Sequence, residues 1–211
     1  MGIAERRERE REQRRNTIID AAEKVFFTKD LQSSTMDDVA AQAELSKGTL
    51  YLYFKSKEDL YLAIHLRGNR ILTKMFREAV QHFKRGIDKV RAVGRAYFEY
   101  YRKFHDYFNA MIYYESHDID YNDQDSIATE CLIEGKTTLQ ILIDAIIHGI
   151  QDGSIRADID PVKTAITLWG QSTGIIQIAA LKKEMLEHNF QMTDAEIIEY
   201  SFDLIHHALE K

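Results

Sequence analysis

The residues best suited to chemistry lie close together between Ser46 and Phe54. A helix that enters the major groove of DNA needs a thin leading turn and side chains that can donate hydrogen bonds to phosphates. Gly48 would supply the thin turn, and Leu50 and Phe54, four residues apart, would anchor the helix to a core. The side chains able to reach a base edge or a phosphate belong to Lys47, Thr49, Tyr51, Tyr53, Lys55 and Lys57. The spacing therefore favours a short DNA-reading helix.

A plainer interpretation of this segment is a short amphipathic helix with surface tyrosines. A glycine inside a helix costs about 1 kcal/mol relative to alanine, so Gly48 needs a compensating role. Close approach to DNA would supply that role, and tight packing against another helix would supply it as well. At this point both interpretations stay open.

Helix-start signals place the segment in a helix-turn-helix. Thr35 to Asp38 form a capping-box pattern with Asp in place of the usual Glu, and Ser46 can cap the following helix. Two short segments, 36–42 and 47–53, are thereby joined by a turn of three or four residues, as in a helix-turn-helix. Ahead of them, an apolar stripe at helical spacing indicates another helix, formed by Ile18, Ala21, Ala22, Val25 and Phe26.

Charge is distributed unevenly along the chain. Residues 1–57 carry 11 Lys and Arg against 10 Asp and Glu, whereas residues 58–211 carry 17 against 24. The net charge of −6 therefore does not exclude a nucleic-acid partner, because only the charge that faces the phosphates matters. Residues 5–15 alternate Arg and Glu, which is typical of a solvated helix or a frayed arm.

Beyond residue 57 the sequence indicates one helix after another. We predict helices near the ranges 57–83, 87–105, 106–114, 124–152, 161–188 and 194–210. One proline and 10 glycines in 211 residues leave few breaks, and the alternation typical of strands is missing. The predicted fold class is all-α, with about nine helices.

The remaining chemistry-bearing residues give no sign of an enzyme. The sequence shows no nucleophile with a base and an orienting group, no phosphate-binding loop and no His pair or Cys cluster for a metal. The acidic stretch 115–125 holds possible ligands but is more typical of a solvated loop. The single Cys131, the charged N-terminus and the lack of long apolar runs predict a cytoplasmic protein without disulfide, signal peptide or membrane span. We expect no cofactor and no metal.

Residues 15–62 resemble the DNA-binding domain of the TetR/AcrR family of regulators. The resemblance is carried by Ile19 to Ala22, Phe26 and Phe27, Thr35 to Ala40, Ser46 to Tyr51, Tyr53 and Phe54, and Lys57 to Leu60. It implies an arm at 1–14, a three-helix DNA-binding domain at 15–60 and a ligand-binding and dimerisation domain at 61–211. It further implies a homodimer on a palindromic double-stranded DNA operator, and it favours a repressor that a small-molecule effector releases.

The resemblance also implies roles within the DNA-binding domain. Thr35 would contact a phosphate through its backbone N–H and hydroxyl, and Lys57 would hold a phosphate at the start of its helix. The recognition helix would carry Ser46, Lys47, Gly48, Thr49, Tyr51 and Tyr53, followed by Lys55 beside the groove. Glu44 stands where the family usually has glycine, and a left-handed conformation there costs on the order of 1 kcal/mol.

Aromatic residues are dense over 87–114, where ordinary core is the simplest explanation for any one of them. So many phenolic hydroxyls suggest a cavity with polar contact points, and the resemblance places an effector pocket among the corresponding helices. We predict that a largely apolar or aromatic effector contacts Tyr97, Tyr101, Phe104, Phe108, Met111, Leu142 and Trp169. A helical ligand carrier or adaptor would explain such a cavity, but it would not explain the run from Ser46 to Tyr53.

The C-terminal segments have the features of a dimer interface. Small residues gather over 170–180, and an apolar stripe runs along the last predicted helix. Packing inside the monomer would explain the stripe, whereas the resemblance implies a bundle of four helices, two from each subunit. The predicted interface residues are Thr173, Gly174, Ile198, Phe202, Ile205 and Leu209.

Overall fold

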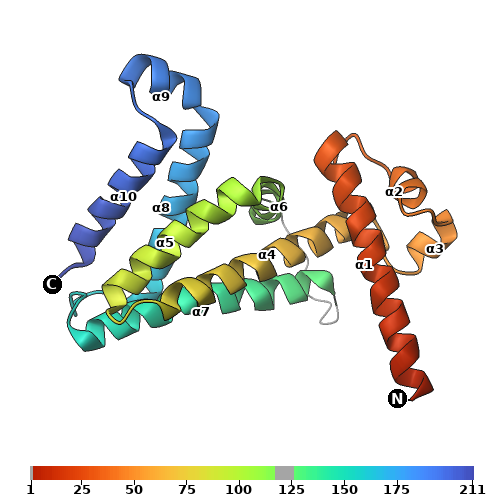
Figure 1. Ribbon diagram of the computed structural model, residues 1–211, viewed down its shortest axis with the longest axis horizontal. Helices are drawn as coiled ribbons and strands as arrows, with labels where there is room; N and C mark the ends of the chain where they lie inside the picture. Colours follow the sequence, from red (N-terminus) through yellow and green to blue (C-terminus); the bar gives the residue numbers. More distant parts are fainter. Residues whose placement is uncertain (1, 117–125) are drawn as a thin grey trace. The chain divides into compact units, whose positions relative to one another are not determined.

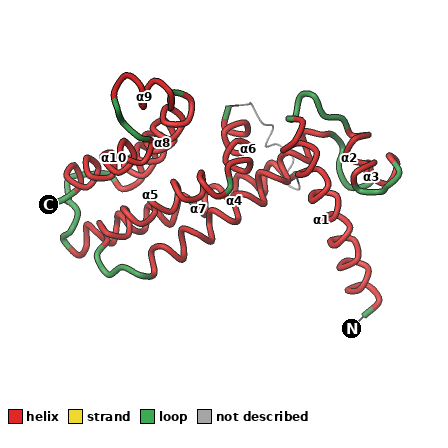
Figure 2. Tube along the Cα trace, turned by 45° about the horizontal axis from the view of Figure 1, so that its top comes forward, coloured by secondary structure: helices red, strands yellow, loops and turns green. Residues whose placement is uncertain are grey.

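The computed structural model describes residues 2–116 and 126–211, and within these ranges the chain is built from helices (Figure 1 and Figure 2). The helices are α1 (Ile3–Lys29), α2 (Met36–Gln42), α3 (Lys47–Tyr51), α4 (Lys57–Gln81), α5 (Gly86–Lys103), α6 (His105–Glu115), α7 (Ile127–Asp152), α8 (Pro161–Leu181), α9 (Lys183–Phe190) and α10 (Asp194–Leu209). Apart from one isolated bridge between Ile155 and Glu210, the described ranges hold no β-structure. The all-α prediction is confirmed. None of the helices described is long and apolar enough to cross a membrane.

The helix boundaries follow the predicted ones closely, with three differences. The segment predicted as one helix over 161–188 divides at Lys182, where the backbone turns to ψ 21° and a new helix starts. The described ranges therefore hold ten helices where about nine were expected. The recognition helix is shorter than 47–53, because α3 ends at Tyr51. The predicted start of the 124–152 helix lies outside the described residues.

The chain divides into two compact units, and α4 and α7 contribute residues to both. The first unit comprises Met1–Gly68 and Asp106–Leu132. Its core is a cluster of buried apolar side chains from α1, α2, α3, α4 and α6, which includes Ile18, Val39, Leu50, Ile64 and Ala110. The helix-turn-helix thus shares its core with α6.

A partly buried group of ion pairs and hydrogen bonds joins α4 and α6 to α1 within the first unit. Arg67 of α4 lies 2.7 Å from Asp20 and 2.9 Å from Glu23 of α1. The hydroxyl of Tyr107 in α6 donates to the same Glu23 at 2.8 Å. The side chains of Arg67 and Glu23 are largely covered, so solvent screens this cluster less than a surface pair.

The second unit comprises Asn69–His105 and Ile133–Lys211. Within it, α5, α8 and α10 pack against one another. The start of α5 touches the backbone of α7, because a side chain on Gly86 would lie 2.0 Å from the Gly149 nitrogen. Glycine is the residue that permits such an approach.

Candidate nucleic-acid interface

The predicted helix-turn-helix is present as α2, a short turn and α3, and each helix begins at a capping side chain. The hydroxyl of Thr35 accepts a hydrogen bond from the Asp38 N–H at 3.1 Å. The hydroxyl of Ser46 accepts one from the Thr49 N–H, also at 3.1 Å. Both caps satisfy backbone groups that a helix start leaves open, so they define where α2 and α3 begin.

The turn and two apolar anchors hold α3 in a single orientation within the first unit. Glu44 has φ 55°, the left-handed conformation that its replacement of a glycine predicts. On one side of α3, Leu50 is fully buried and Phe54 is 1% exposed, and both pack into the core cluster. The opposite side of α3 is left to solvent.

The solvent face of α3 centres on Gly48. A side chain at this position would meet only the Ser46 hydroxyl, 3.9 Å away, so packing within the protein does not require glycine here. Tyr51 is 45% exposed beside it. Of the two roles considered for Gly48, the open space favours close approach of a partner over tight helix packing.

Leu52 is a residue of this face that the sequence analysis did not single out. It is 79% exposed, an unusual state for a leucine beside a buried core. It follows Gly48 by four residues, and that spacing was the signal that it shares the same face. An apolar side chain in a major groove can contact the methyl group of thymine. Beyond it, Tyr53 is half-buried and Lys55 is exposed.

The lysine of the recognition helix is paired with an acid from the preceding helix. Lys47 Nζ lies 2.8 Å from a carboxylate oxygen of Asp37, and this hydrogen bond raises the pKa of Lys47. Both side chains are exposed, so salt and competing phosphates weaken the pair. The Thr49 hydroxyl likewise shares a hydrogen bond with the Ser46 hydroxyl at 2.8 Å. Lys47 and Thr49 must exchange these contacts to reach a base.

The groups that Thr35 was predicted to offer to a phosphate are occupied. Its N–H and its hydroxyl both donate to the Asp38 carboxylate, at 2.9 and 2.8 Å. A hydrogen bond from Lys29, followed by those from Thr35, lowers the pKa of Asp38 to about 2. Asp38 is therefore charged at neutral pH, and a phosphate has to displace it from Thr35. The phosphate contact of Thr35 stays a prediction.

Lys57 is held by the protein's own backbone. Its Nζ donates to three carbonyl oxygens, at 3.0, 3.4 and 3.5 Å, which belong to Leu31, Gln32 and Ser34. These carbonyls lie in the loop that leads into Thr35. The contact that the structure gives Lys57 is therefore a positioning one, and its predicted phosphate contact remains untested.

The residues predicted to bind an effector divide between the two units. Tyr97, Tyr101, Phe104, Leu142 and Trp169 belong to the second unit, and Phe108 and Met111 are buried in the first. The hydroxyl of Tyr97 on α5 lies 2.9 Å from that of Thr173 on α8. Tyr101 is half-buried, and burial raises the pKa of its hydroxyl. In the second unit, Tyr97 of α5 thus contacts α8. Trp169, also on α8, is 38% exposed.

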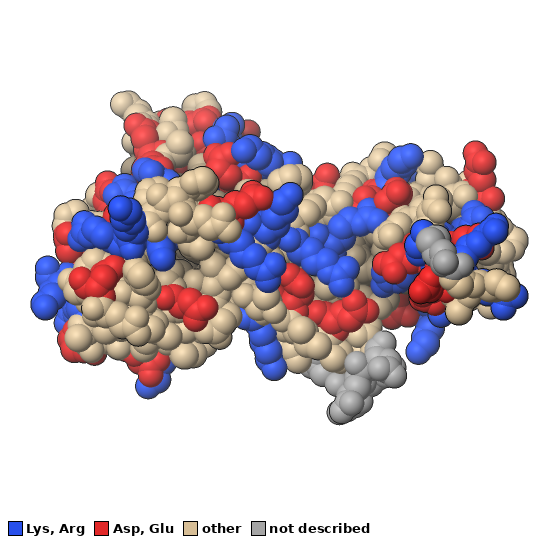
Figure 3. Space-filling view, turned by 60° about the horizontal axis from the view of Figure 1, so that its bottom comes forward, with Lys and Arg blue, Asp and Glu red and all other residues tan. Residues whose placement is uncertain are grey.

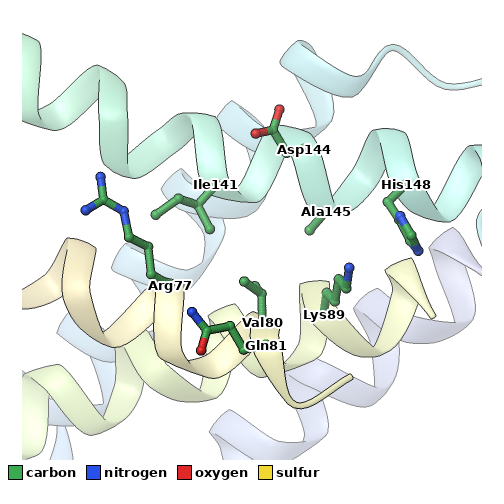
Figure 4. A pocket seen from close by; sticks show the side chains of 8 residues that line it. All are labelled: Arg77, Val80, Gln81, Lys89, Ile141, Asp144, Ala145 and His148. Atoms are coloured by element: carbon green, nitrogen blue, oxygen red, sulfur yellow. The ribbon is translucent and has the colours of Figure 1, made fainter. Parts of the chain in front are cut away.

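A hollow of about 400 Å³ lies between α4, α5 and α7 of the second unit (Figure 4). Its polar side chains include Arg77 from α4, Lys89 from α5, and Asp144 and His148 from α7. None of the predicted effector residues lines it. Val80, Ile141 and Ala145 add apolar surface beside these polar groups, so the hollow combines the two kinds of lining that ligand sites use.

Of the six predicted dimer residues, three are buried inside the protomer and three are half-buried. Ile198, Phe202 and Leu209 are buried, and the Phe202 ring covers Gly94 of α5. Thr173, Gly174 and Ile205 are half-buried. Elsewhere on α8 and α10, large apolar side chains are exposed, namely Val162, Ile166, Trp169, Ile178, Leu181, Tyr200 and Leu204. Internal packing covers Ile198, Phe202 and Leu209, whereas the predicted interface itself stays a prediction. The exposed residues of α8 and α10 are further candidates for contact with a partner.

Other chemistry is sparse in the part of the chain that the structure describes. There, no group of three or more His, Cys, Asp and Glu is placed to hold a metal ion. Most of the acidic stretch 115–125 lies outside the described residues. Cys131 is buried, with its thiol 3.5 Å from the Leu62 carbonyl oxygen. On the face shown in Figure 3, Lys and Arg are interspersed with Asp and Glu.

Comparison with known proteins points to one family. The family described as bacterial regulatory proteins, tetR family, matches residues 18–64. The HTH-type transcriptional regulator YhgD of Bacillus subtilis is 30% identical over 159 residues, which cover 74% of this chain and 78% of that protein. The HTH-type transcriptional activator FasR of Mycolicibacterium smegmatis is 28% identical over 136 residues, which cover 64% of this chain and 60% of FasR.

A solved structure extends the likeness over nearly the whole chain. The transcriptional regulator FadR from Bacillus subtilis, in complex with stearoyl-CoA, superposes with a TM-score of 0.70 at 20% identity. The superposition covers 91% of this chain and 97% of that one, and at this identity it shows a shared fold. These relatives are transcriptional regulators and not enzymes, in agreement with the sequence prediction.

Proposed function

The chain belongs to the tetR family of bacterial regulatory proteins, and from that membership we propose that it is a repressor that binds a palindromic operator as a homodimer and leaves it when an apolar effector binds. The observation that carries the proposal is the solvent face of α3. Gly48 has open space above it, while Leu50 and Phe54 fix the opposite face in the core. A helix anchored in this way can approach base edges in a major groove with its backbone.

The proposed base contacts come from Lys47 and Thr49, which flank Gly48 on α3, and from Leu52, which directly follows α3. The proposed phosphate contacts come from Tyr51, Tyr53 and Lys55. Lys47 exchanges its exposed partner Asp37 for a base edge on binding, at little cost because the pair is solvated.

The proposed homodimer rests on two exposed stripes of the second unit. On α8 the stripe is formed by the exposed Val162, Ile166 and Trp169 and the half-buried Thr173. On α10 it is formed by the exposed Tyr200, Leu204 and Ala208 and the half-buried Ile197. Steps of three and four residues put each set on one helix face. Exposed apolar patches of this kind mark interaction sites. Two copies that pair these stripes about a twofold axis form a four-helix bundle, and the axis matches the symmetry of a palindrome.

We place the effector at the aromatic face of α5, against Tyr97, Tyr101, Phe104 and Leu142. The chemical class proposed is a long-chain acyl thioester, because FadR, which shares the fold, holds stearoyl-CoA. The half-buried Tyr101 hydroxyl would bind the polar end of such a ligand, and the apolar carbons would bind its chain. Release of DNA requires that the ligand bind the DNA-free state more tightly than the DNA-bound state.

Stearoyl-CoA is expected to release the protein from an operator obtained by selection from random duplexes, whereas CoA without an acyl chain is not. Tyr101→Ala should raise the stearoyl-CoA concentration for half release by about tenfold or more, a loss of about 1.4 kcal/mol, with unchanged operator affinity. Phe83→Ala removes another exposed aromatic ring of the same unit and should respond as wild type. Fluorescence anisotropy of the labelled operator measures both quantities.

A different experimental result would contradict each part of this proposal. No release by stearoyl-CoA would show that the ligand class is wrong. A Tyr101→Ala variant that responds like wild type would show that the location is wrong. Tighter operator binding in the presence of stearoyl-CoA would overturn the repressor assignment.

A further inference from the structure

The N-terminal half of α1, which we term the arm (residues 3–15), carries charge that the helix-turn-helix does not use. Residues 3–14 are exposed, and the first buried residue of α1 is Ile18. In both ribbon views this half of α1 extends past α2 and α3 (Figure 1 and Figure 2). At about 1.5 Å per residue, Arg7 lies about 16 Å beyond Ile18 along the helix.

The charges of the arm are separated by helix face. Arg7, Arg11 and Arg14 are four and three residues apart, so they form one stripe. Val25 follows Arg7 by about five full turns, so this arginine face continues the buried face of α1 beyond the core. Of the four acids in the arm, three lie on a different face, namely Glu5, Glu8 and Glu12. The fourth, Glu10, lies three residues after Arg7 and four before Arg14, so it borders the arginine face. A net count of the arm therefore understates the positive charge of its arginine face.

The arginine face is not neutralised by the protein itself. Among residues 2–116 and 126–211, the arm makes a single ion pair, in which Arg6 lies 2.8 Å from Glu10. The acid that borders the arginine face is thus paired with an arginine outside that face. At the base of the arm, the Arg15 guanidinium lies 5.3 Å from the centre of the Phe54 ring. Phe54 follows α3, so the base of the arm lies beside the C-terminal end of the recognition helix.

We propose that Arg7, Arg11 and Arg14 bind backbone phosphates of the double-stranded DNA that flanks each half-site. The inference rests on the proposed function, because it takes α3 to lie in the major groove. Duplex DNA carries about one negative charge per 1.7 Å of its axis, and guanidinium groups pair well with phosphates. One turn of DNA spans about 34 Å, so an arm of about 16 Å beside α3 covers about half a turn beyond the half-site.

The test compares two variants of the full chain that lose the same charge from different faces. Arg7→Gln/Arg11→Gln removes two members of the arginine face, and Arg6→Gln/Arg9→Gln removes two arginines outside it. Each cation–phosphate contact contributes about 0.9 to the slope of log Kobs against log salt. For a dimer, Arg7→Gln/Arg11→Gln should lower that slope by about 3 to 4, whereas Arg6→Gln/Arg9→Gln should change it by less than about 1. Unchanged far-UV circular dichroism confirms that both variants fold.

The length of the duplex provides a second readout. Removing about five base pairs from each end, about half a turn, should weaken wild-type binding and leave Arg7→Gln/Arg11→Gln binding unchanged. The arm proposal would be overturned by equal salt slopes for the two variants, or by a wild-type affinity that does not depend on the length of the flanking DNA. Neither result would affect the proposed operator recognition. Altered sedimentation of Arg7→Gln/Arg11→Gln with an unchanged slope would assign the arm to a protein contact and overturn it too. If the wild-type protein binds all duplex sequences equally, the proposed function is overturned, and the arm proposal with it.

Discussion

Replacing Gly48 by leucine is expected to abolish specific operator binding while the protein stays at least as stable as wild type. In the folded chain a side chain at this position meets only the Ser46 hydroxyl, 3.9 Å away, so leucine has room. Leucine also favours a helix over glycine by up to about 1 kcal/mol, so the free energy of unfolding should not fall. On DNA the same side chain would stand between α3 and the base edges.

The expected loss of operator affinity is large because it affects both half-sites. A good base contact is worth about 1–3 kcal/mol, and each 1.4 kcal/mol is a tenfold change in affinity. Gly48→Leu should therefore weaken operator binding by at least about 100-fold, and Gly48→Ala, with its smaller side chain, by less. Anisotropy titrations and urea unfolding of the same samples measure the two effects. Wild-type affinity in Gly48→Leu would show that α3 does not approach bases, and a large loss of stability would show that Gly48 has a packing role.

Charge placed on the exposed stripes of α8 and α10 is expected to convert the dimer to monomers. Ile166 is 49% exposed and Leu204 is 50% exposed, so glutamate at both positions should leave the protomer folded. A charge buried without a partner in an interface costs about 3–5 kcal/mol, so the dissociation constant of the dimer should rise by at least about 100-fold. Sedimentation velocity at micromolar concentration should show Ile166→Glu/Leu204→Glu as a monomer that no longer binds the full operator.

Two further substitutions separate dissociation from unfolding. Ile133→Glu introduces one such charge at a 60% exposed position on α7 and should stay dimeric. Phe202→Glu buries a charge against Gly94 inside the protomer, so it should unfold the chain instead of dissociating it. A dimer that persists in Ile166→Glu/Leu204→Glu would place the interface on another surface.

The parts of the molecule that sequence patterns predicted well are those that local interactions decide. The starts of α2 and α3 come from Thr35 and Ser46, whose hydroxyls bond to N–H groups three residues ahead. The left-handed turn at Glu44 is equally local. Such interactions lie within one helical turn, so the order of residues is enough to locate them.

The interactions that the sequence analysis missed join residues far apart in the chain. Lys47 pairs with Asp37 across the turn, and Lys57 bonds to carbonyl groups more than 20 residues earlier. A basic side chain in a DNA-binding motif suggests a phosphate contact. Residue spacing alone does not show that a carboxylate or a carbonyl oxygen of the protein already binds that side chain. The same limit applied to α10, where periodicity grouped Ile198 with Phe202 but did not show that Phe202 lies against Gly94 of α5.

The most direct test of the central claim, that α3 of a dimeric chain reads DNA, is selection of binding sites from random duplexes by the wild-type protein. We expect a palindrome whose half-site centres lie about 34–36 Å apart, or a multiple of that distance. Thr49→Ala and Leu52→Ala should each relax the base preference at one position per half-site, because each removes a side chain beside Gly48. No enriched palindrome, or the same base preferences in wild type and both variants, would contradict the account.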